Sequence, residues 1–152
     1  MKKIIISIFA ILVFGILWYA GSPLFINKKV NEAFPAQQTS ATTTNEIVAT
    51  GMFTGFDRLH NGTGTAKLLK INNQYVVRFE DDFEVTNGPD LYVGFGKDGQ
   101  YKEGSEIAAL KGNIGSQNYE LPPTLEVKDF NEVWIWCKRF SVPFAKAPLV
   151  TN

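Results

Sequence analysis

The pattern of apolar and polar positions divides the chain into three parts. Ile4 to Phe25 consists mainly of Ile, Leu, Val and Phe and contains no charged residue. Residues 27–46 are mostly small and polar and show no periodicity, whereas from residue 47 onward short apolar runs are separated by Gly, Asn and Pro. The pattern predicts an apolar anchor or signal segment over residues 1–26, a flexible linker over 27–46 and a folded domain over 47–152.

The folded part reads as β-structure throughout. Gln74 to Glu80 alternates between apolar and polar positions, and Phe130 to Phe140 is the strongest strand pattern. No segment after residue 30 shows a sustained helical period. Short strands separated by turn residues predict an all-β domain, an antiparallel β-sandwich or small barrel. Val142 to Leu149 is expected to be an edge strand, because its prolines cannot donate to a central ladder.

The apolar N-terminal segment is long enough for one transmembrane helix, since about 20 apolar residues cross a bilayer. Trp18 and Tyr19 suit the interface at its far end. The alternative is a cleaved signal peptide, whose apolar core is shorter and ends in small residues. Trp18, two positions upstream of Ala20, is not the small residue that this cleavage pattern requires, so we expect an uncleaved signal anchor. The resulting prediction is a single-pass cell-membrane protein with an extracytoplasmic C-terminal domain.

Charge and cysteine content exclude several classes of function. Residues 1–30 carry lysines and no acid, so acids outnumber bases in the remainder although the whole chain has a formal net charge of zero. A domain without a basic face is not expected to bind nucleic acid. The single cysteine excludes an intrachain disulfide and a zinc site of several thiolates.

That cysteine, Cys137, is the residue with the most distinctive chemistry. Strand alternation places it in phase with Val133 and Ile135, and it places Trp134 and Trp136 on the opposite face. One interpretation is an inert core cysteine. The other is a redox thiol, whose pKa the two following basic residues would lower, or a ligand to a haem iron or copper.

Other candidates are weaker. His60, the only histidine, is either a turn residue or a second ligand or proton carrier. The acidic run Glu80 to Glu84 would suit calcium, but its spacing matches no EF-hand loop, and a solvated strand end is the better interpretation. No metal site is therefore assigned, and no triad or carboxylate pair stands out, so whether the protein is an enzyme stays open.

A series of short motifs resembles the electron-transfer DM-13 domain family, which includes domains found beside DOMON domains in Skeletor-type proteins. The resemblance spans about residues 47–149. The motifs, in order, are Gly51-Met52-Phe53, His60-Asn61-Gly62-Thr63-Gly64-Thr65-Ala66, Phe79-Glu80-Asp81-Asp82-Phe83, Asn87-Gly88-Pro89-Asp90-Leu91-Tyr92-Val93, Leu110-Lys111-Gly112-Asn113-Ile114-Gly115-Ser116-Gln117-Asn118-Tyr119, Val133-Trp134-Ile135-Trp136-Cys137 and Phe140-Ser141-Val142-Pro143-Phe144-Ala145-Lys146-Ala147.

The resemblance implies a β-rich fold and a functional cysteine at Cys137, either as a bare redox thiol or as a ligand to a prosthetic group such as haem. We therefore expect an electron-transfer or thiol-redox role, with His60, Trp134 and Trp136 as candidate cofactor-binding residues beside Cys137. The expected partners are the membrane, through the N-terminal helix, and a separate redox protein. The alternative is a non-catalytic cell-surface binding or adhesion module in which the cysteine is structural.

Overall fold

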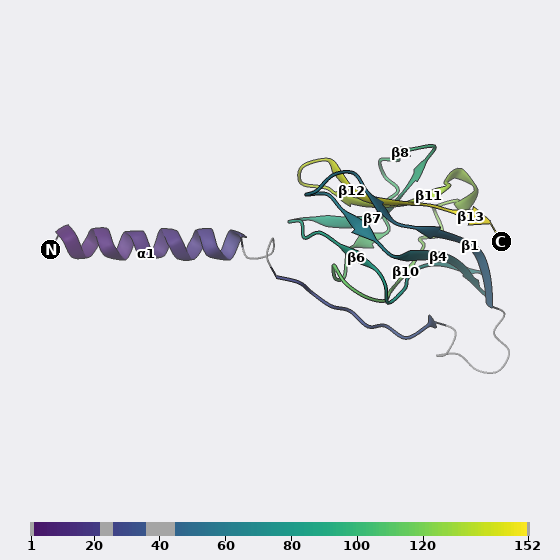
Figure 1. The fold of residues 1–152 in the computed structure, drawn as a ribbon, viewed down its shortest axis with the longest axis horizontal. Helices are drawn as coiled ribbons and strands as arrows, with labels where there is room; N and C mark the ends of the chain where they lie inside the picture. The colour runs from purple at the N-terminus through teal and green to yellow at the C-terminus, as the bar shows by residue number, and fades with distance from the viewer. Residues whose placement is uncertain (1, 22–25, 36–44, 152) are drawn as a thin grey trace.

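A computed structural model describes residues 2–21, 26–35 and 45–151 of the chain. One helix precedes a domain built almost entirely of strands (Figure 1). The elements are α1 (Lys2–Gly21), β1 (Asn45–Met52), β2 (Thr54–Gly55), β3 (Gly62–Thr63), β4 (Thr65–Ile71), β5 (Gln74–Phe79), β6 (Glu84–Val85), β7 (Leu91–Lys97), β8 (Gln100–Tyr101), β9 (Ala108–Ala109), β10 (Gln117–Glu120), the 3-10 helix η3 (Val127–Asp129), β11 (Glu132–Cys137), β12 (Val142–Pro148) and β13 (Val150–Thr151).

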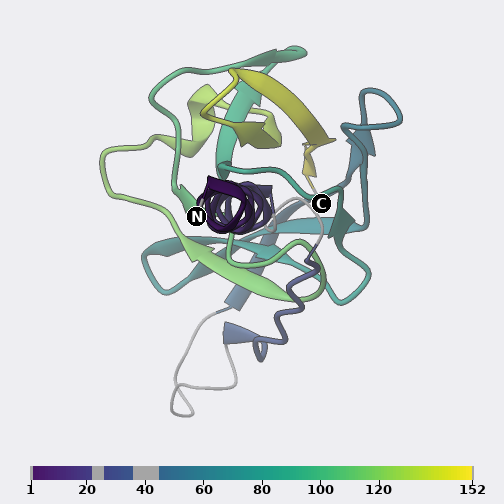
Figure 2. The same ribbon diagram turned by 90° about the vertical axis from the view of Figure 1, so that its left-hand side faces the viewer.

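Two larger sheets and one strand pair make up the domain (Figures 1 and 2). The five-stranded sheet has the order β10-β5-β4-β1-β13, and the six-stranded sheet has the order β2-β12-β11-β7-β8 with β9 beside β7. β3 and β6 form the separate pair, and every pairing between named strands is antiparallel. The predicted antiparallel all-β class is therefore confirmed.

The two larger sheets share one hydrophobic core. Val77 and Phe79 enter it from β5, and Val93, Phe95 and Ile135 enter it from β7 and β11. Each of these side chains is almost fully buried. Because alternate residues of a strand point to opposite faces, the period-2 pattern of the sequence builds this core directly.

The predicted transmembrane segment is not borne out. α1 forms where the apolar run predicts a helix. It begins at Lys2 and ends at Gly21, and residues 22–25 lie outside the described residues. Over the part of the chain that the structure describes, no helix has both the length and the apolar character needed to cross a membrane.

Residues 27–35 of the predicted linker lie against the domain (Figure 1). Lys29 bridges Ile114, and the Val30 amide donates to the Ile114 carbonyl at 2.9 Å. The Glu32 carboxylate accepts from the Lys111 ammonium at 2.8 Å. These are specific contacts that a polar composition does not reveal. Of the rest of the predicted linker, residues 36–44 lie outside the described residues and residues 45–46 begin β1.

The edge-strand prediction for the final proline-containing run is also wrong, because β12 lies between β2 and β11. β2 pairs with β12 only at Ala145 and Lys146. Pro143 and Pro148 lie beyond that short ladder, so the missing proline N–H groups interrupt nothing on the β2 side.

Candidate functional site

The two faces of β11 carry the residues that the sequence singled out. Val133, Ile135 and Cys137 point into the shared core, and each has an exposed fraction of 0%. Trp134 and Trp136 take part in ring contacts with aromatic residues outside this core cluster. The predicted alternation is confirmed, so Cys137 and the two tryptophans lie on opposite sides of one strand.

Cys137 is a free, buried cysteine at the last position of β11. It pairs with Leu91 of β7 on one side and Val142 of β12 on the other. The residues that follow, 138–141, form an exposed turn. The thiol is thus closed from solvent but lies next to the end of a hairpin.

A β-bulge lies beside Cys137. The register between β11 and β12 shifts after Ile135, so that Trp136 pairs with Pro143 and leaves Phe144 as the extra residue. Ser141, in the turn, has a φ of 52°, a left-handed conformation that costs free energy for a residue with a Cβ. The hairpin end that covers Cys137 therefore combines an irregular ladder with a strained turn residue.

The structure places His60 in a turn, in contact with Asp57 and Phe144. Its Nδ1 lies 2.8 Å from Asp57 Oδ2, and its ring packs edge-on against Phe144 with centroids 4.7 Å apart. The same Asp57 carboxylate accepts the backbone N–H groups of Leu59 and His60. The hydrogen bonds from His60 lower the pKa of Asp57. No contact recorded for His60 within the described residues involves Cys137.

The outer side of β11 carries an aromatic row, which we define as Phe56, Trp134, Tyr101 and Trp136. Tyr101 of β8 stacks on Trp136, with ring centroids 4.3 Å apart and planes inclined by 3°. The ring centroid of Trp134 lies 6.0 Å from that of Tyr101 and 5.4 Å from that of Phe56. The structure thus brings the two predicted tryptophans together through Tyr101, which the sequence did not indicate.

Glu132 and Lys146 form an ion pair that holds Trp134 within the aromatic row. Glu132, only 5% exposed, accepts from the Trp134 indole N–H at 3.0 Å and from the Lys146 ammonium at 3.0 Å. The Gly99 backbone N–H donates to the same carboxylate. A buried carboxylate with three donors is well compensated, so Glu132 fixes the orientation of Trp134.

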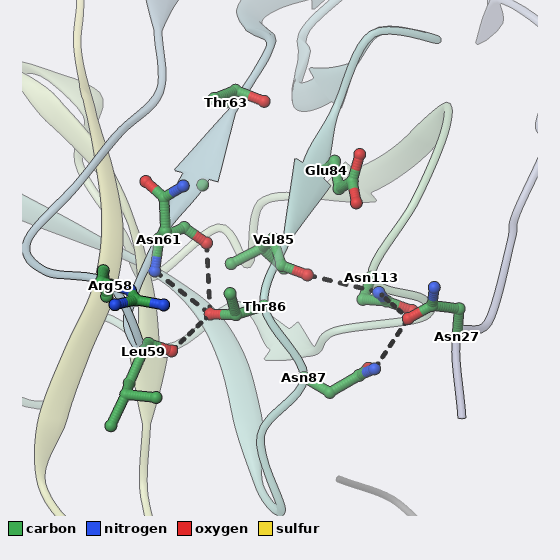
Figure 3. A pocket seen from close by; sticks show the side chains of 11 residues that line it. Asn27, Arg58, Leu59, Asn61, Thr63, Glu84, Val85, Thr86, Asn87 and Asn113 are labelled. Carbon is green, nitrogen blue, oxygen red and sulfur yellow. Dashed lines mark hydrogen bonds between the residues drawn. The ribbon is translucent and has the colours of Figure 1, made fainter. Parts of the chain in front are cut away.

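The largest described cavity is polar and lies elsewhere. Its volume is about 570 Å³, and Asn27, Asn61, Asn87 and Asn113 contribute to its walls (Figure 3). Asn27 Oδ1 accepts from the amide groups of Asn87 and Asn113 at 2.8 and 3.0 Å. The amide and hydroxyl groups in the walls of this cavity suit hydrogen bonding to a small polar molecule.

The residues do not fit the haem site that the sequence suggested. The walls of the four described cavities, about 390 to 570 Å³, contain neither Cys137 nor His60. Cys137 Sγ is enclosed in the core, and the His60 ring is engaged by Asp57. Cys137 and His60 therefore share none of the described cavities, so the two side chains do not form one ligand set for a haem.

The acidic run considered for calcium is engaged by protein donors. Asp82 accepts from the Thr65 N–H and hydroxyl, at 2.9 and 2.8 Å. Glu80 pairs with Lys67 and Arg78. Within the described residues, no group of three or more His, Cys, Asp or Glu side chains could hold a metal ion.

Sequence reasoning missed Tyr101, Glu132 and the glycines beneath the aromatic row. A Cβ at Gly96 would collide with the Trp134 indole nitrogen, and a Cβ at Gly94 would lie 3.0 Å from the Tyr101 hydroxyl oxygen. The signal was present in Gly94-Phe95-Gly96, where small residues alternate with a core residue along one strand. Such glycines in a strand indicate a close approach from another element.

A model of the family described as "Electron transfer DM13" matches residues 53–149. No curated protein and no solved structure matches the chain. The matched range contains the folded strands from β2 to β12, including His60, Tyr101, both tryptophans of β11 and Cys137.

Proposed function

Because this chain belongs to the electron transfer DM13 family, we propose that its β domain transfers electrons through Cys137, with the thiol reached when the end of the β11–β12 hairpin opens. The observation that carries this proposal is the position of Cys137: fully buried, yet the last residue of its strand and next to the exposed turn 138–141. Opening of one hairpin end costs less than unfolding the domain.

The chemistry available to this thiol follows from its being the only cysteine in the chain. A two-electron oxidation of Cys137 produces a disulfide only with a sulfur from another molecule. In that exchange the Cys137 thiolate attacks one sulfur of the incoming disulfide, the old S–S bond breaks, and the second sulfur leaves as a thiolate. Cys137 is thereby oxidised, and the partner is reduced.

The direct test is mixed-disulfide formation by the folded full chain. We expect oxidised glutathione to add slowly to Cys137 in native buffer, as one glutathione in the mass spectrum, and excess reduced glutathione to reverse the addition. Cys137→Ala gives the background. Addition that occurs only in denaturant would contradict the proposal.

A second candidate is a non-catalytic binding module, and the complete burial of Cys137 among core side chains favours it. In this account the cysteine fills space and has no reaction partner. The glutathione experiment separates the two candidates, because a core-filling thiol reacts only after the whole domain unfolds.

Location outside the cytoplasm is a further part of the proposal. This location is supported by the position of α1 before the β domain and by the exposed apolar side chains of that helix, among them Ile8, Phe9 and Phe14. A fusion of alkaline phosphatase to the C-terminus tests it, because that enzyme becomes active only after export. An inactive fusion of normal abundance would contradict this location.

A further inference from the structure

Tyr101 has a buried hydroxyl group with no hydrogen-bond partner among the described contacts. It is the only buried side-chain polar atom without a hydrogen-bond partner in the described part of the chain. Buried polar groups are almost always paired, so an orphaned one calls for a specific explanation. The rest of the Tyr101 ring stacks on Trp136, which is itself half-buried.

The surroundings of this hydroxyl provide a proton acceptor. Burial and then the nearby Glu106 carboxylate raise the pKa of Tyr101 well above its ordinary value of 10.0, with a smaller contribution from Glu103. The hydroxyl of Ser105 opposes this shift. A carboxylate therefore lies near the phenol, although no hydrogen bond between the two groups is among the described contacts.

Two glycines of β7 and the Glu132 carboxylate hold the stacked rings in place. Gly94 and Gly96 of β7 leave room for Tyr101 and Trp134, since a Cβ at either position would press on one of those rings. Glu132 holds the Trp134 indole by a 3.0 Å hydrogen bond. Three electron-rich rings thus lie in a fixed order, from the half-buried Trp136 through Tyr101 to the buried Trp134.

We propose that Tyr101 and Trp136 form a one-electron oxidation site on the outer face of the six-stranded sheet. This inference rests on the proposed electron-transfer function and adds a second redox group to it. A high-potential, outer-sphere one-electron oxidant contacts the Trp136 side and takes one electron from the stacked pair. The Tyr101 O–H bond then breaks, its proton goes to the Glu106 carboxylate, and the products are a neutral tyrosyl radical, a protonated Glu106 and the reduced oxidant.

The experiment uses the full chain and photogenerated ruthenium(III) tris-bipyridine as the oxidant, with a cobalt(III) ammine complex as the final electron acceptor. Freeze-quenched samples are read by electron paramagnetic resonance, which distinguishes tyrosyl from tryptophanyl radicals. The expected result is a tyrosyl radical that Tyr101→Phe reduces at least several-fold. Tyr92→Phe is the matched control, since Tyr92 is half-buried and pairs with Trp136 across the strands but does not stack with it in the described contacts.

Two further variants test the roles of the neighbours. Trp136→Phe keeps a ring but removes the more easily oxidised indole, so the tyrosyl yield falls. Glu106→Gln removes the proton acceptor, so the radical forms more slowly and its rate gains a larger solvent deuterium effect. Thermal unfolding of Tyr101→Phe checks the fold, and only a small loss is expected because the described contacts give the hydroxyl no hydrogen bond.

Equal tyrosyl yields in wild-type protein and Tyr101→Phe would overturn this inference, as would a yield that falls equally in Tyr92→Phe. Either result leaves the glutathione reaction of Cys137 untouched, because that reaction takes place on the inner face. Conversely, failure of the glutathione reaction with a Tyr101 radical present would remove the thiol proposal alone.

Discussion

The inner and outer faces of β11 carry different chemistry within one strand. On the inner face, Cys137 follows Val133 and Ile135 in a fully buried apolar row. On the outer face, Trp136 is half-buried and stacks on Tyr101. An electron acceptor at the surface can approach the outer rings directly, whereas a reagent for the thiol needs the hairpin to open first.

This difference separates two kinds of electron transfer. Thiol exchange makes and breaks covalent bonds, so the sulfur must touch its partner. One-electron oxidation of a stacked aromatic pair requires no such bond. The burial of Cys137 therefore limits thiol chemistry without limiting the outer face.

The comparison is sharpened most by truncating one residue on each face. Ile135→Ala should destabilise the domain by about 2–5 kcal/mol, because it leaves a cavity in a closed core. Trp136→Ala should cost less, about 1–3 kcal/mol, from the lost stacking on Tyr101 and the lost burial of a half-buried ring. Urea unfolding measures both. Equal losses would mean that the outer row is a second core and would remove the distinction between the faces.

The polarity of the inner face is tested by Cys137→Ser. A hydroxyl placed among core side chains without a partner should cost about 1–3 kcal/mol relative to wild-type protein. Cys137→Ala is the matched variant, because it removes the sulfur without adding a polar group. A serine variant more stable than the alanine variant would show that a polar partner reaches this position.

The packing of the outer face is tested by adding a methyl group at Gly96, beneath Trp134. Gly96→Ala should destabilise the domain by about 1–3 kcal/mol and change the tryptophan fluorescence, because the new Cβ displaces the Trp134 indole. Gly15→Ala in α1 is the control, because within the described residues the added methyl would meet nothing within 4 Å beyond its chain neighbours and the backbone of its own helix. An unchanged fluorescence spectrum would contradict the described position of Trp134.

The smallest expected effect is that of relieving the strained turn at the end of the β11–β12 hairpin, which covers the Cys137 thiol. Ser141→Gly removes left-handed strain of up to about 1 kcal/mol and should slow thiol labelling of Cys137 by up to about fivefold. Asn72→Gly is the control, because Asn72 also has a positive φ, at 55°, but lies in the β4–β5 turn. Equal slowing by both variants would assign labelling to opening of the whole domain.

Local patterns predicted much of the fold. Alternation along Glu132–Cys137 correctly separated the inner face from the outer face, because strand geometry has a fixed period of two. The same local reasoning failed at β12, whose prolines suggested an edge. The length of the neighbouring β2 ladder decides whether a proline is tolerated there, and no property of the β12 sequence encodes it.

Contacts between distant segments could not be predicted. Residues 27–35 were predicted to belong to a linker, but Gly112 and Gly115 leave space for the backbone carbonyls of Lys28 and Val30. Tyr101 joins the two tryptophans only because β8 folds back onto β7. In both cases a glycine allows a close approach, but the sequence does not say which segment approaches.

The most direct test of the central claim is the rate of thiol labelling of Cys137 in the folded full chain, measured across urea concentrations below the unfolding transition. Opening of the hairpin end predicts labelling far slower than that of a free thiol, faster than global unfolding allows, and only weakly dependent on urea. A labelling rate that follows the full urea dependence of global unfolding would contradict the claim, and so would immediate labelling in native buffer.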